Sequence, residues 1–348
     1  MKDKKIIISS IIFALLFAVT FSILFLTYKV SDLIMCIKMI KISYYVIIIF
    51  GVFLYFLFEG LYFKVMFNSM NEKISLIRCF HYAFVEFFFS GITPGSTGGQ
   101  PLQLYYMNQD KLPNKKSMIS LILNTILFKL FLVVGGILIL IFKPNYVFTS
   151  GNLVKVLFFI GFIYDIFITI ACLLLMYDQK IISKILTIIY KIYNKFSSKK
   201  IDYNSKIDEI TRAYVDEAVY LKENIGTLIL STILVFIQRT ILFSIIYFIY
   251  RSLNTNINLN YFDILLLQLF VQISLEICVL PGQTGINEYI TSILYLTIFD
   301  TLAIQGMILN RLFIFYLPLL ISFVLIMINA RFLYKSKKEI KNSIEKPI

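Results

Sequence analysis

Long apolar runs separated by short polar stretches are the main pattern of this chain. Six of these runs are long enough to cross the ~30 Å hydrocarbon core of a bilayer as helices, which takes about 20 residues. The six runs are Ile6–Tyr28, Ile42–Phe63, Ser117–Phe142, Leu153–Tyr177, Ile225–Tyr250 and Ile304–Ala330. No small-x-small cleavage site follows the first run, so we interpret it as an uncleaved anchor. The pattern predicts an all-α, polytopic integral membrane protein with about six full spans.

Two further apolar segments, Cys79–Met107 and Tyr261–Phe299, are interrupted by runs that contain proline and glycine. Both interruptions carry the pattern Pro-Gly-x-Thr-Gly, and the two copies begin 187 residues apart. The first break contains Pro94, Gly95, Thr97, Gly98, Gly99 and Gln100, and the second contains Pro281, Gly282, Thr284 and Gly285. Proline disfavours helix at the residue before it, and glycine permits turns that other residues resist. We therefore predict two re-entrant hairpins of half-helices, with ordinary surface loops between short spans as the alternative.

Basic residues are distributed unevenly between the two sides of the predicted spans. If the N-terminus lies inside and each interrupted segment returns to its own side, the inside stretches hold 24 Lys and Arg and the outside stretches hold 5. Cytoplasmic loops carry the excess of Lys and Arg in membrane proteins. We therefore expect both termini to be cytoplasmic, and the two interrupted segments to enter from opposite faces of the membrane.

The entry of the two interrupted segments from opposite faces, together with their matching breaks, predicts an inverted-topology repeat. In such repeats the broken helices mark the binding site. We expect one transmembrane domain over residues 1–348. Repeat one covers about 42–177, a cytoplasmic loop covers 178–224, repeat two covers about 225–330, and a basic cytoplasmic tail covers 331–348. The loop contains apolar pairs at helical spacing, which fits either an amphipathic helix on the inner leaflet or a plain connector.

Composition supports the membrane class and narrows the chemistry. Hydrophobic residues make up 59% of the chain, charged residues make up 15%, and the mean hydropathy is +0.83. The net charge of +13 comes from Lys and Arg in the loops, where membrane proteins place them for topology. We therefore expect no direct nucleic-acid partner. The four cysteines and the single histidine show no metal-ligand spacing, and no Walker A motif occurs, so we expect neither a metal nor another cofactor.

Polar and charged residues within and beside the spans are the remaining candidates for a site. A charge near the bilayer centre costs at least ~2.5–3.5 kcal/mol, so it usually faces a cavity or a partner. These residues are Asn124, Lys129, Arg239, Glu276, Glu288 and Arg311. Together with the two breaks, we expect them to bind a substrate, with the cations and the N-termini of the half-helices holding an anionic headgroup. Ion pairs that only join helices are the alternative, and we interpret the isolated Asp165 as interfacial.

At the two breaks the chain resembles the flippase-like membrane family, which shares its fold with the N-terminal region of lysylphosphatidylglycerol synthases, the multiple peptide resistance factor proteins. In that family the first break reads Pro-Gly-x-x-Gly-Gly-acid-x-x-Arg, and the second ends in Gly-x-x-Glu. Pro94–Gly99 and Gly285–Glu288 match these patterns. Gln100 stands where an acid is usual and Gln103 where an arginine is usual, which indicates a neutralised pair.

The resemblance, which covers nearly the whole chain, implies a lipid substrate in the bacterial plasma membrane. It implies translocation of an anionic or aminoacylated phospholipid, of the phosphatidylglycerol or lysylphosphatidylglycerol class, between the leaflets. The synthases add a domain that transfers lysine from lysyl-tRNA to phosphatidylglycerol. This chain ends 18 residues after its last predicted span, so we expect no soluble aminoacyltransferase domain and no catalytic residues.

Two alternative functions stay open. In the first alternative the chain is a phosphatidylglycerol lysyltransferase or the membrane subunit of one. It would then work with a separately encoded aminoacyltransferase as its partner. The other alternative is a transporter of a small anion that uses the same repeat.

Overall fold

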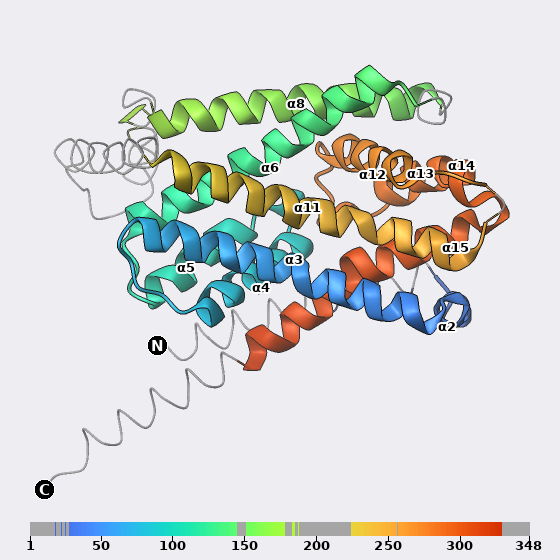
Figure 1. Cartoon of the computed structure of the whole chain (residues 1–348), viewed down its shortest axis with the longest axis horizontal. Helices are drawn as coiled ribbons and strands as arrows, with labels where there is room; N and C mark the ends of the chain where they lie inside the picture. The colour runs from blue at the N-terminus through green and yellow to red at the C-terminus, as the bar shows by residue number, and fades with distance from the viewer. Residues whose placement is uncertain are drawn as a thin grey trace, which may run out of the picture.

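The computed structural model describes residues 28–144, 151–177, 224–255 and 257–328, together with the single positions 18, 22, 25, 183, 184 and 187. Regular structure in these residues is helical, without a strand, and the prediction of an all-α, polytopic membrane protein is confirmed (Figure 1). The long helices are α3 (Ile42–Ser69), α6 (Asn114–Phe142), α8 (Asn152–Tyr177) and α11 (Ile225–Leu253). The shorter elements are α2 (Val30–Met39), α4 (Leu76–Ile92), η1 (Pro94–Ser96), α5 (Gly99–Gln109), α12 (Tyr261–Leu275), η2 (Pro281–Gln283), α13 (Ile286–Leu294), α14 (Leu296–Phe299), η3 (Asp300–Leu302), α15 (Ala303–Arg311) and η4 (Leu312–Tyr316), after which the helix continues to Ile328.

Five helical segments of the described ranges are long and apolar enough to cross a membrane. Four of them are the long helices α3, α6, α8 and α11, and the fifth is the kinked series Pro281–Ile328. Each segment covers one of the six predicted spans to within a few residues, but the fifth begins at Pro281, well before the predicted start at Ile304. The other predicted span, Ile6–Tyr28, lies almost wholly outside the described residues, as do the loop 178–224 and the tail 331–348.

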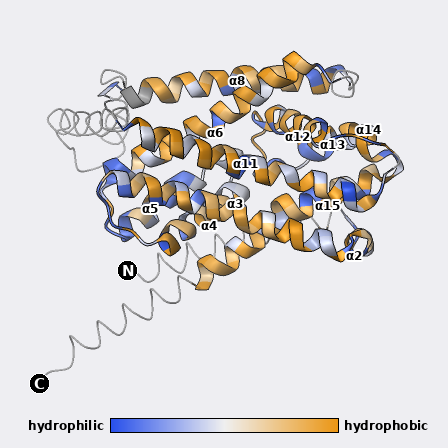
Figure 2. Cartoon of the chain, in the orientation of Figure 1, coloured by the Kyte–Doolittle hydropathy of each residue, from blue (hydrophilic) through white to orange (hydrophobic). Residues whose placement is uncertain are grey.

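The outer surface of the bundle is apolar, as a lipid-facing surface must be. Figure 2 shows hydrophobic residues along the lengths of the helices and hydrophilic residues gathered toward the two ends of the bundle. On α8 the side chains of Ile163 and Phe167 are 64% and 65% exposed, values that would be unusual for large apolar residues of a water-soluble surface. We therefore interpret α8 as a helix that faces lipid along most of its length.

The core is formed by α3 packed along α11, with α6 and α12 against them and α8 outermost (Figure 1). α8 contacts α12 along one stripe. Phe158 stacks on Phe270 with ring centroids 4.5 Å apart, and one turn later Gly161 lies against the backbone of α12. A Cβ at Gly161 would lie only 1.9 Å from the carbonyl oxygen of Ile273. This close approach brings Asp165, one turn further along α8, to the centre of the bundle.

The two interrupted segments form hairpins whose tips meet. The first hairpin is α4–η1–α5 and the second is α12–η2–α13–α14, and they lie toward opposite ends of the bundle (Figure 1). α4 ends because Thr93, the residue before Pro94, takes an extended conformation (φ −108°, ψ 146°). Leu280 before Pro281 is likewise extended (φ −67°, ψ 142°). This is the arrangement expected of two re-entrant segments that enter from opposite sides, while the membrane orientation and the repeat stay predictions.

Two features of the helices were not anticipated. The stretch 29–41, which lies between the first two predicted spans, contains the helix α2, which buries Leu33 and Cys36. The last predicted span contains the π-helical turn η4 directly after Arg311. Such wide turns are rare and are frequently found at functional sites. Apolar length alone carries no signal for either feature.

Candidate functional site

The Pro-Gly-x residues of the two breaks share one local backbone conformation. Gly95 and Gly282 have φ values of 60° and 58°, in the left-handed region that glycine adopts without a steric penalty. The next residue of each break also has a positive φ. The hydroxyl of Thr97 donates to the carbonyl of Pro94 at 2.9 Å, and that of Thr284 donates to the carbonyl of Pro281 at 3.1 Å. The Pro-Gly-x part of the pattern therefore forms the same turn twice, and the breaks diverge at the threonine, where Thr97 is helical (ψ −14°) and Thr284 is extended (ψ 148°).

The tips of the two breaks are joined by a backbone hydrogen bond. The N–H of Gly95 donates to the carbonyl of Val279 at 2.7 Å. Around this contact the first break is open, since Pro94, Gly95, Thr97 and the following Gln100 are all exposed. Val279 is also 68% exposed, so the junction lies at a surface of the bundle.

Two glycines of the first break hold its arms together. A Cβ at Gly99 would lie 2.2 Å from the Ser90 hydroxyl, and a Cβ at Gly98 would lie 2.6 Å from the Thr93 side chain. The N–H of Gly98 donates to the Thr93 hydroxyl at 2.9 Å. Both glycines are therefore required for α5 to approach the end of α4.

The two glutamines that replace the charged residues of the family pattern contact different groups. Gln103 is fully buried, and its amide donates to the backbone carbonyl of Tyr82 at 3.1 Å and to Glu59 at 3.4 Å. Gln100 is exposed, and its amide donates to the Thr125 hydroxyl. Each glutamine therefore interacts with a helix other than its own, and the interpretation of these positions as a neutralised pair stays a prediction.

The second break is closed by an ion pair. Arg311 Nε lies 2.9 Å from Glu288 Oε1, and Arg311 Nη2 donates to the carbonyl of Gly282 at 2.9 Å. The other oxygen of Glu288 accepts the N–H of Gly285 at 2.6 Å, at the start of α13. The Phe315 ring stacks against the Arg311 guanidinium, 4.7 Å from its centroid. Glu288 therefore places an internal carboxylate at the N-terminus of α13, where an anion is stabilised.

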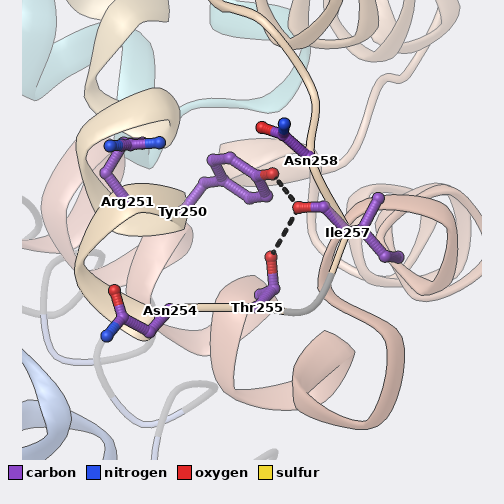
Figure 3. A pocket seen from close by; sticks show the side chains of 6 residues that line it. All are labelled: Tyr250, Arg251, Asn254, Thr255, Ile257 and Asn258. Atoms are coloured by element: carbon purple, nitrogen blue, oxygen red, sulfur yellow. Dashed lines mark hydrogen bonds between the residues drawn. The ribbon is translucent and has the colours of Figure 1, made fainter.

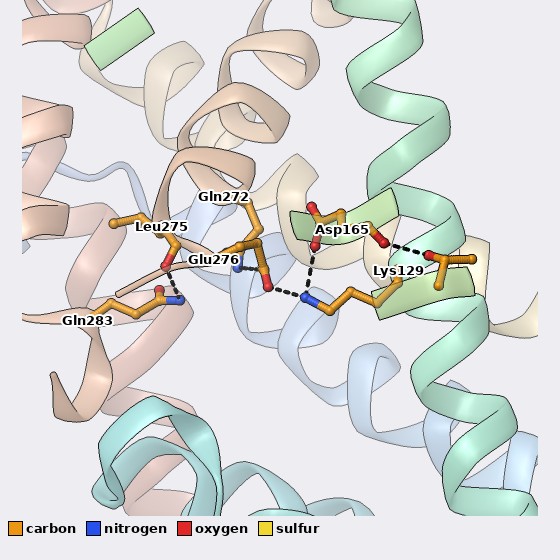
Figure 4. A network of polar contacts seen from close by, with 7 residues as sticks. Lys129, Asp165, Gln272, Leu275, Glu276 and Gln283 are labelled. Carbon is orange, nitrogen blue, oxygen red and sulfur yellow. Dashed lines mark hydrogen bonds and ion pairs between the residues drawn. The ribbon is translucent and has the colours of Figure 1, made fainter. Parts of the chain in front are cut away.

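Lys129, Asp165 and Glu276 form a buried ion triad between α6, α8 and the end of α12 (Figure 4). Lys129 Nζ lies 2.9 Å from Asp165 Oδ1 and contacts Glu276 Oε2. The Gln272 amide donates to the other oxygen of Glu276 at 2.8 Å. The interpretation of Asp165 as an isolated interfacial residue was wrong, since its side chain is fully buried and paired. Sequence separations of 36 and 147 residues hide this pairing from the sequence.

Arg239 occupies a second buried cluster that contains a residue missed by the sequence analysis. Arg239 Nη1 donates to the Tyr55 hydroxyl at 3.1 Å, and the guanidinium interacts electrostatically with Glu59 and Glu86. Glu59 is 1% exposed and accepts a hydrogen bond from the Gln238 amide at 2.9 Å. As the single charge within the predicted span Ile42–Phe63, Glu59 was marked by the same signal that identified Lys129.

The ring of Phe128 connects the Arg239 cluster to the triad. Its centroid lies 4.1 Å from the Arg239 guanidinium carbon and 5.5 Å from Lys129 Nζ. Asn124 lies on the same helix as Phe128, and its Oδ1 is buried without a hydrogen-bond partner in the described structure. The predicted site residues therefore gather in three places: the joined breaks, the Arg311–Glu288 pair and the linked interior clusters.

A cavity of about 190 Å³ lies apart from these residues, at the turn between α11 and α12. The Tyr250 hydroxyl donates to the carbonyl of Ile257, and the Thr255 hydroxyl donates to the same carbonyl at 3.3 Å (Figure 3). These bonds hold the turn, so we interpret the cavity as a feature of the loop. In the described part of the chain no group of three His, Cys, Asp or Glu side chains is placed to hold a metal ion.

Comparison with known proteins gives two matches. A family model described as the lysylphosphatidylglycerol synthase transmembrane region matches residues 6–322. A UPF0104 membrane protein of Pyrococcus horikoshii is 23% identical over 282 residues, which make up 77% of this chain and 82% of that protein. The family match spans both breaks and all the charged clusters described above.

Proposed function

We propose, from the premise that this chain belongs to the family of lysylphosphatidylglycerol synthase transmembrane regions, that it moves a phospholipid between the two leaflets of a membrane. The substrate is an anionic or aminoacylated phospholipid of the phosphatidylglycerol or lysylphosphatidylglycerol class. The headgroup crosses along the joined breaks while the acyl chains stay in lipid. The membrane is the bacterial plasma membrane, with both termini on the cytoplasmic side.

The observation that carries this proposal is the junction of the two breaks. Irregular backbone at membrane depth is tolerated only where it is buried in protein or lines a wet cavity. Here the first break is exposed at Pro94, Gly95 and Thr97, although the bundle around it is apolar. An exposed polar backbone between apolar helices is the surface along which a headgroup passes while its acyl chains remain outside.

The two breaks differ in how their returning helices begin. α13 begins at a site already occupied by the carboxylate of Glu288. α5 begins after Gly98 without a side-chain cap, and its first residues are Gly99 and Gln100. The first N–H groups of a helix have no intrahelical acceptor and favour an anion. We therefore place the phosphate of the headgroup at the start of α5.

The interior cations were expected to hold the anionic headgroup, but in this arrangement they have another role. Lys129 and Arg311 are each bound to carboxylates of the protein itself, and Arg239 interacts with two further carboxylates. In this closed arrangement they balance buried acids. They become available to a headgroup only when the breaks separate and these contacts open.

The test is transbilayer movement of fluorescent phospholipids by the purified chain in liposomes. Fluorescent phosphatidylglycerol, lysylphosphatidylglycerol and phosphatidylcholine are compared, with chemical quenching of the outer leaflet as the readout. We expect the first two lipids to move faster than the third, and faster than in protein-free liposomes. Equal movement of all three lipids would contradict the proposal that the protein selects its substrate by the headgroup.

The matched variants are Gln100→Glu and Gln109→Glu. Gln100→Glu puts a carboxylate where the phosphate is placed, and no arginine follows three residues later to compensate it. We expect movement of phosphatidylglycerol to slow roughly tenfold, equivalent to about 1.4 kcal/mol. Gln109→Glu adds the same charge at the exposed far end of α5 and should leave the rate within about twofold of the parent, since an exposed single charge is worth little. Equal rates for both variants would contradict the placement.

The alternative functions are separate outcomes of the same preparation. Uptake of labelled inorganic phosphate without lipid movement would assign a small-anion transporter. Formation of lysylphosphatidylglycerol only after a separate aminoacyltransferase and lysyl-tRNA are added would assign a membrane subunit of a synthase.

A further inference from the structure

Buried carboxylates outnumber buried cations at the centre of the bundle. In the ion triad Lys129 contacts two carboxylates, those of Asp165 and Glu276. If all three groups were ionised, the triad would carry one excess negative charge. Asp165 is fully buried, and its second oxygen, Oδ2, has no hydrogen-bond partner in the described structure. An uncompensated charge in such surroundings is costly, and buried acids neutralise instead.

The described elements around the triad supply no further cation to balance the excess. From α12 the triad is faced by the neutral Gln272, and from α8 by the ring of Tyr164, 5.1 Å from Lys129 Nζ, and by the thiol of Cys172. From α11, Arg239 contacts the Phe128 ring, with its guanidinium carbon 4.1 Å from the centroid, and it interacts with Glu59 and Glu86.

Arg239 is itself faced by two carboxylates, Glu59 from α3 and Glu86 from α4. The two linked clusters thus place four carboxylates around two cations. Among the described residues no further cation completes the charge of the triad.

The triad also connects the fixed and the broken parts of the fold. Lys129 lies on α6 and Asp165 on α8, whereas Glu276 is the residue that ends α12, directly before the second break. The Gln283 amide of that break donates to the carbonyl of Leu275, the last residue of α12 (Figure 4). Neutralising Glu276 removes the ionic contact that ties the end of α12 to α6. The charge state of the triad therefore acts directly on the second break.

We propose that the Lys129–Asp165–Glu276 triad binds one exchangeable proton, and that loading and release of this proton are coupled to movement of the lipid. This inference rests on the proposed lipid movement and adds its driving force. The proton comes from the aqueous phase on one side, forms an O–H bond with one of the two carboxylates, and returns to the aqueous phase on the other side. The two carboxylates share a single ammonium, so the proton belongs to the pair.

Proton occupancy is measured directly on the full-length chain by infrared difference spectroscopy during a pH titration, without any lipid movement. The wild type should show the carbonyl stretch of a protonated carboxyl at neutral pH. Asp165→Asn and Glu276→Gln each leave one ammonium and one carboxylate in the triad, so both should lose the triad's part of this band, whereas Glu59 and Glu86 beside Arg239 are unchanged and keep theirs. Asp300→Asn is the matched control, because Asp300 is exposed in η3 and asparagine tolerates its positive φ of 50°. This control should retain the band.

Coupling is measured in liposomes with a trace of fluorescent phosphatidylglycerol and the membrane potential clamped to zero. For one proton per lipid, a gradient of one pH unit should shift the steady-state ratio of lipid between leaflets by about tenfold. The two triad variants should show no shift, each compared with its own distribution without a gradient. A sodium gradient should have no effect.

The outcomes separate the two proposals. Absence of the carboxyl band in the wild type, a band of undiminished intensity in both triad variants, or lipid movement that responds to sodium or to no gradient would overturn the proton site or its coupling while lipid movement stands. If no lipid moves, the proposed function fails, and the infrared band alone decides whether the triad holds a proton.

Discussion

The approach of α8 to α12 at Gly161 allows a quantitative prediction about the centre of the bundle. In Gly161→Ala the new Cβ would lie 1.9 Å from the carbonyl oxygen and 2.9 Å from the carbonyl carbon of Ile273. Since these atoms belong to the backbone, no side-chain rotation relieves the clash. The two helices must separate by about 1 Å before the contact becomes tolerable.

The expected loss of stability has two parts. Overpacking a close interface costs typically about 1–3 kcal/mol. Asp165 lies one turn along the same face of α8, so the separation also lengthens its 2.9 Å contact with Lys129, and breaking a buried ion pair costs about 3–5 kcal/mol. We therefore expect the free energy of unfolding to fall by at least about 2 kcal/mol. The midpoint of thermal unfolding should fall by roughly 3 °C or more.

The assay uses a thiol-reactive fluorescent dye on the purified protein in detergent. Cys36, Cys79 and Cys278 are buried, so the dye reacts as the bundle opens. Gly226→Ala is the matched control, because a Cβ at this position in the first turn of α11 meets no atom within 4 Å. Alanine there should leave the midpoint unchanged or slightly raised, since it is the better helix former. If Gly161→Ala unfolds at the same temperature as Gly226→Ala, the close approach of α8 to α12 is refuted.

Two further comparisons use the same dye assay. In Gly282→Ala the residue has a φ of 58° and the new Cβ would lie 2.4 Å from a ring carbon of Phe315 in η4, whereas in Gly285→Ala the φ is 84° and the Cβ enters open space. We expect the free energy of unfolding to fall by about 1–3 kcal/mol more in the first variant than in the second. Equal losses would contradict the clash with Phe315. Tyr82→Phe removes a 2.7 Å hydrogen bond to Asp110 and should cost about 1.5–3 kcal/mol. Arg78→Gln removes only a partly exposed 3.7 Å ion pair to the same carboxylate and should cost less than about 1 kcal/mol, and the opposite order would refute the ranking.

The positions of the helices followed from the sequence because a bilayer selects for long apolar runs. The predicted span Ser117–Phe142 is contained in α6, Asn114–Phe142, and both breaks lie at the predicted prolines. Proline acts on the residue directly before it, so this signal is local and readable. α2 lacks such a signal, since a ten-residue helix is too short to span the membrane.

The partners of the buried charges did not follow from the sequence. A charge within an apolar run indicates that a partner exists, which is why Lys129, Arg239 and Arg311 were identified. The partner depends on the rotation and depth of other helices, and these are set by packing contacts such as Gly161 against Ile273. Asp165 was therefore assigned to the interface although it belongs to the triad. The substrate-binding roles of all these residues stay predictions.

The hydrogen bond between Gly95 and Val279 joins groups that are synthesised far apart in time. The acceptor follows the donor by about 180 residues, which takes roughly 10–40 s at ordinary translation rates. During this interval the first hairpin is inserted without the segment that completes its tip. The first break must therefore remain close to water, or be held by the insertion machinery, until the second half of the chain arrives. Assembly of this fold is limited by the order in which the chain emerges, and a truncated first half would leave an unpaired backbone donor at the first break.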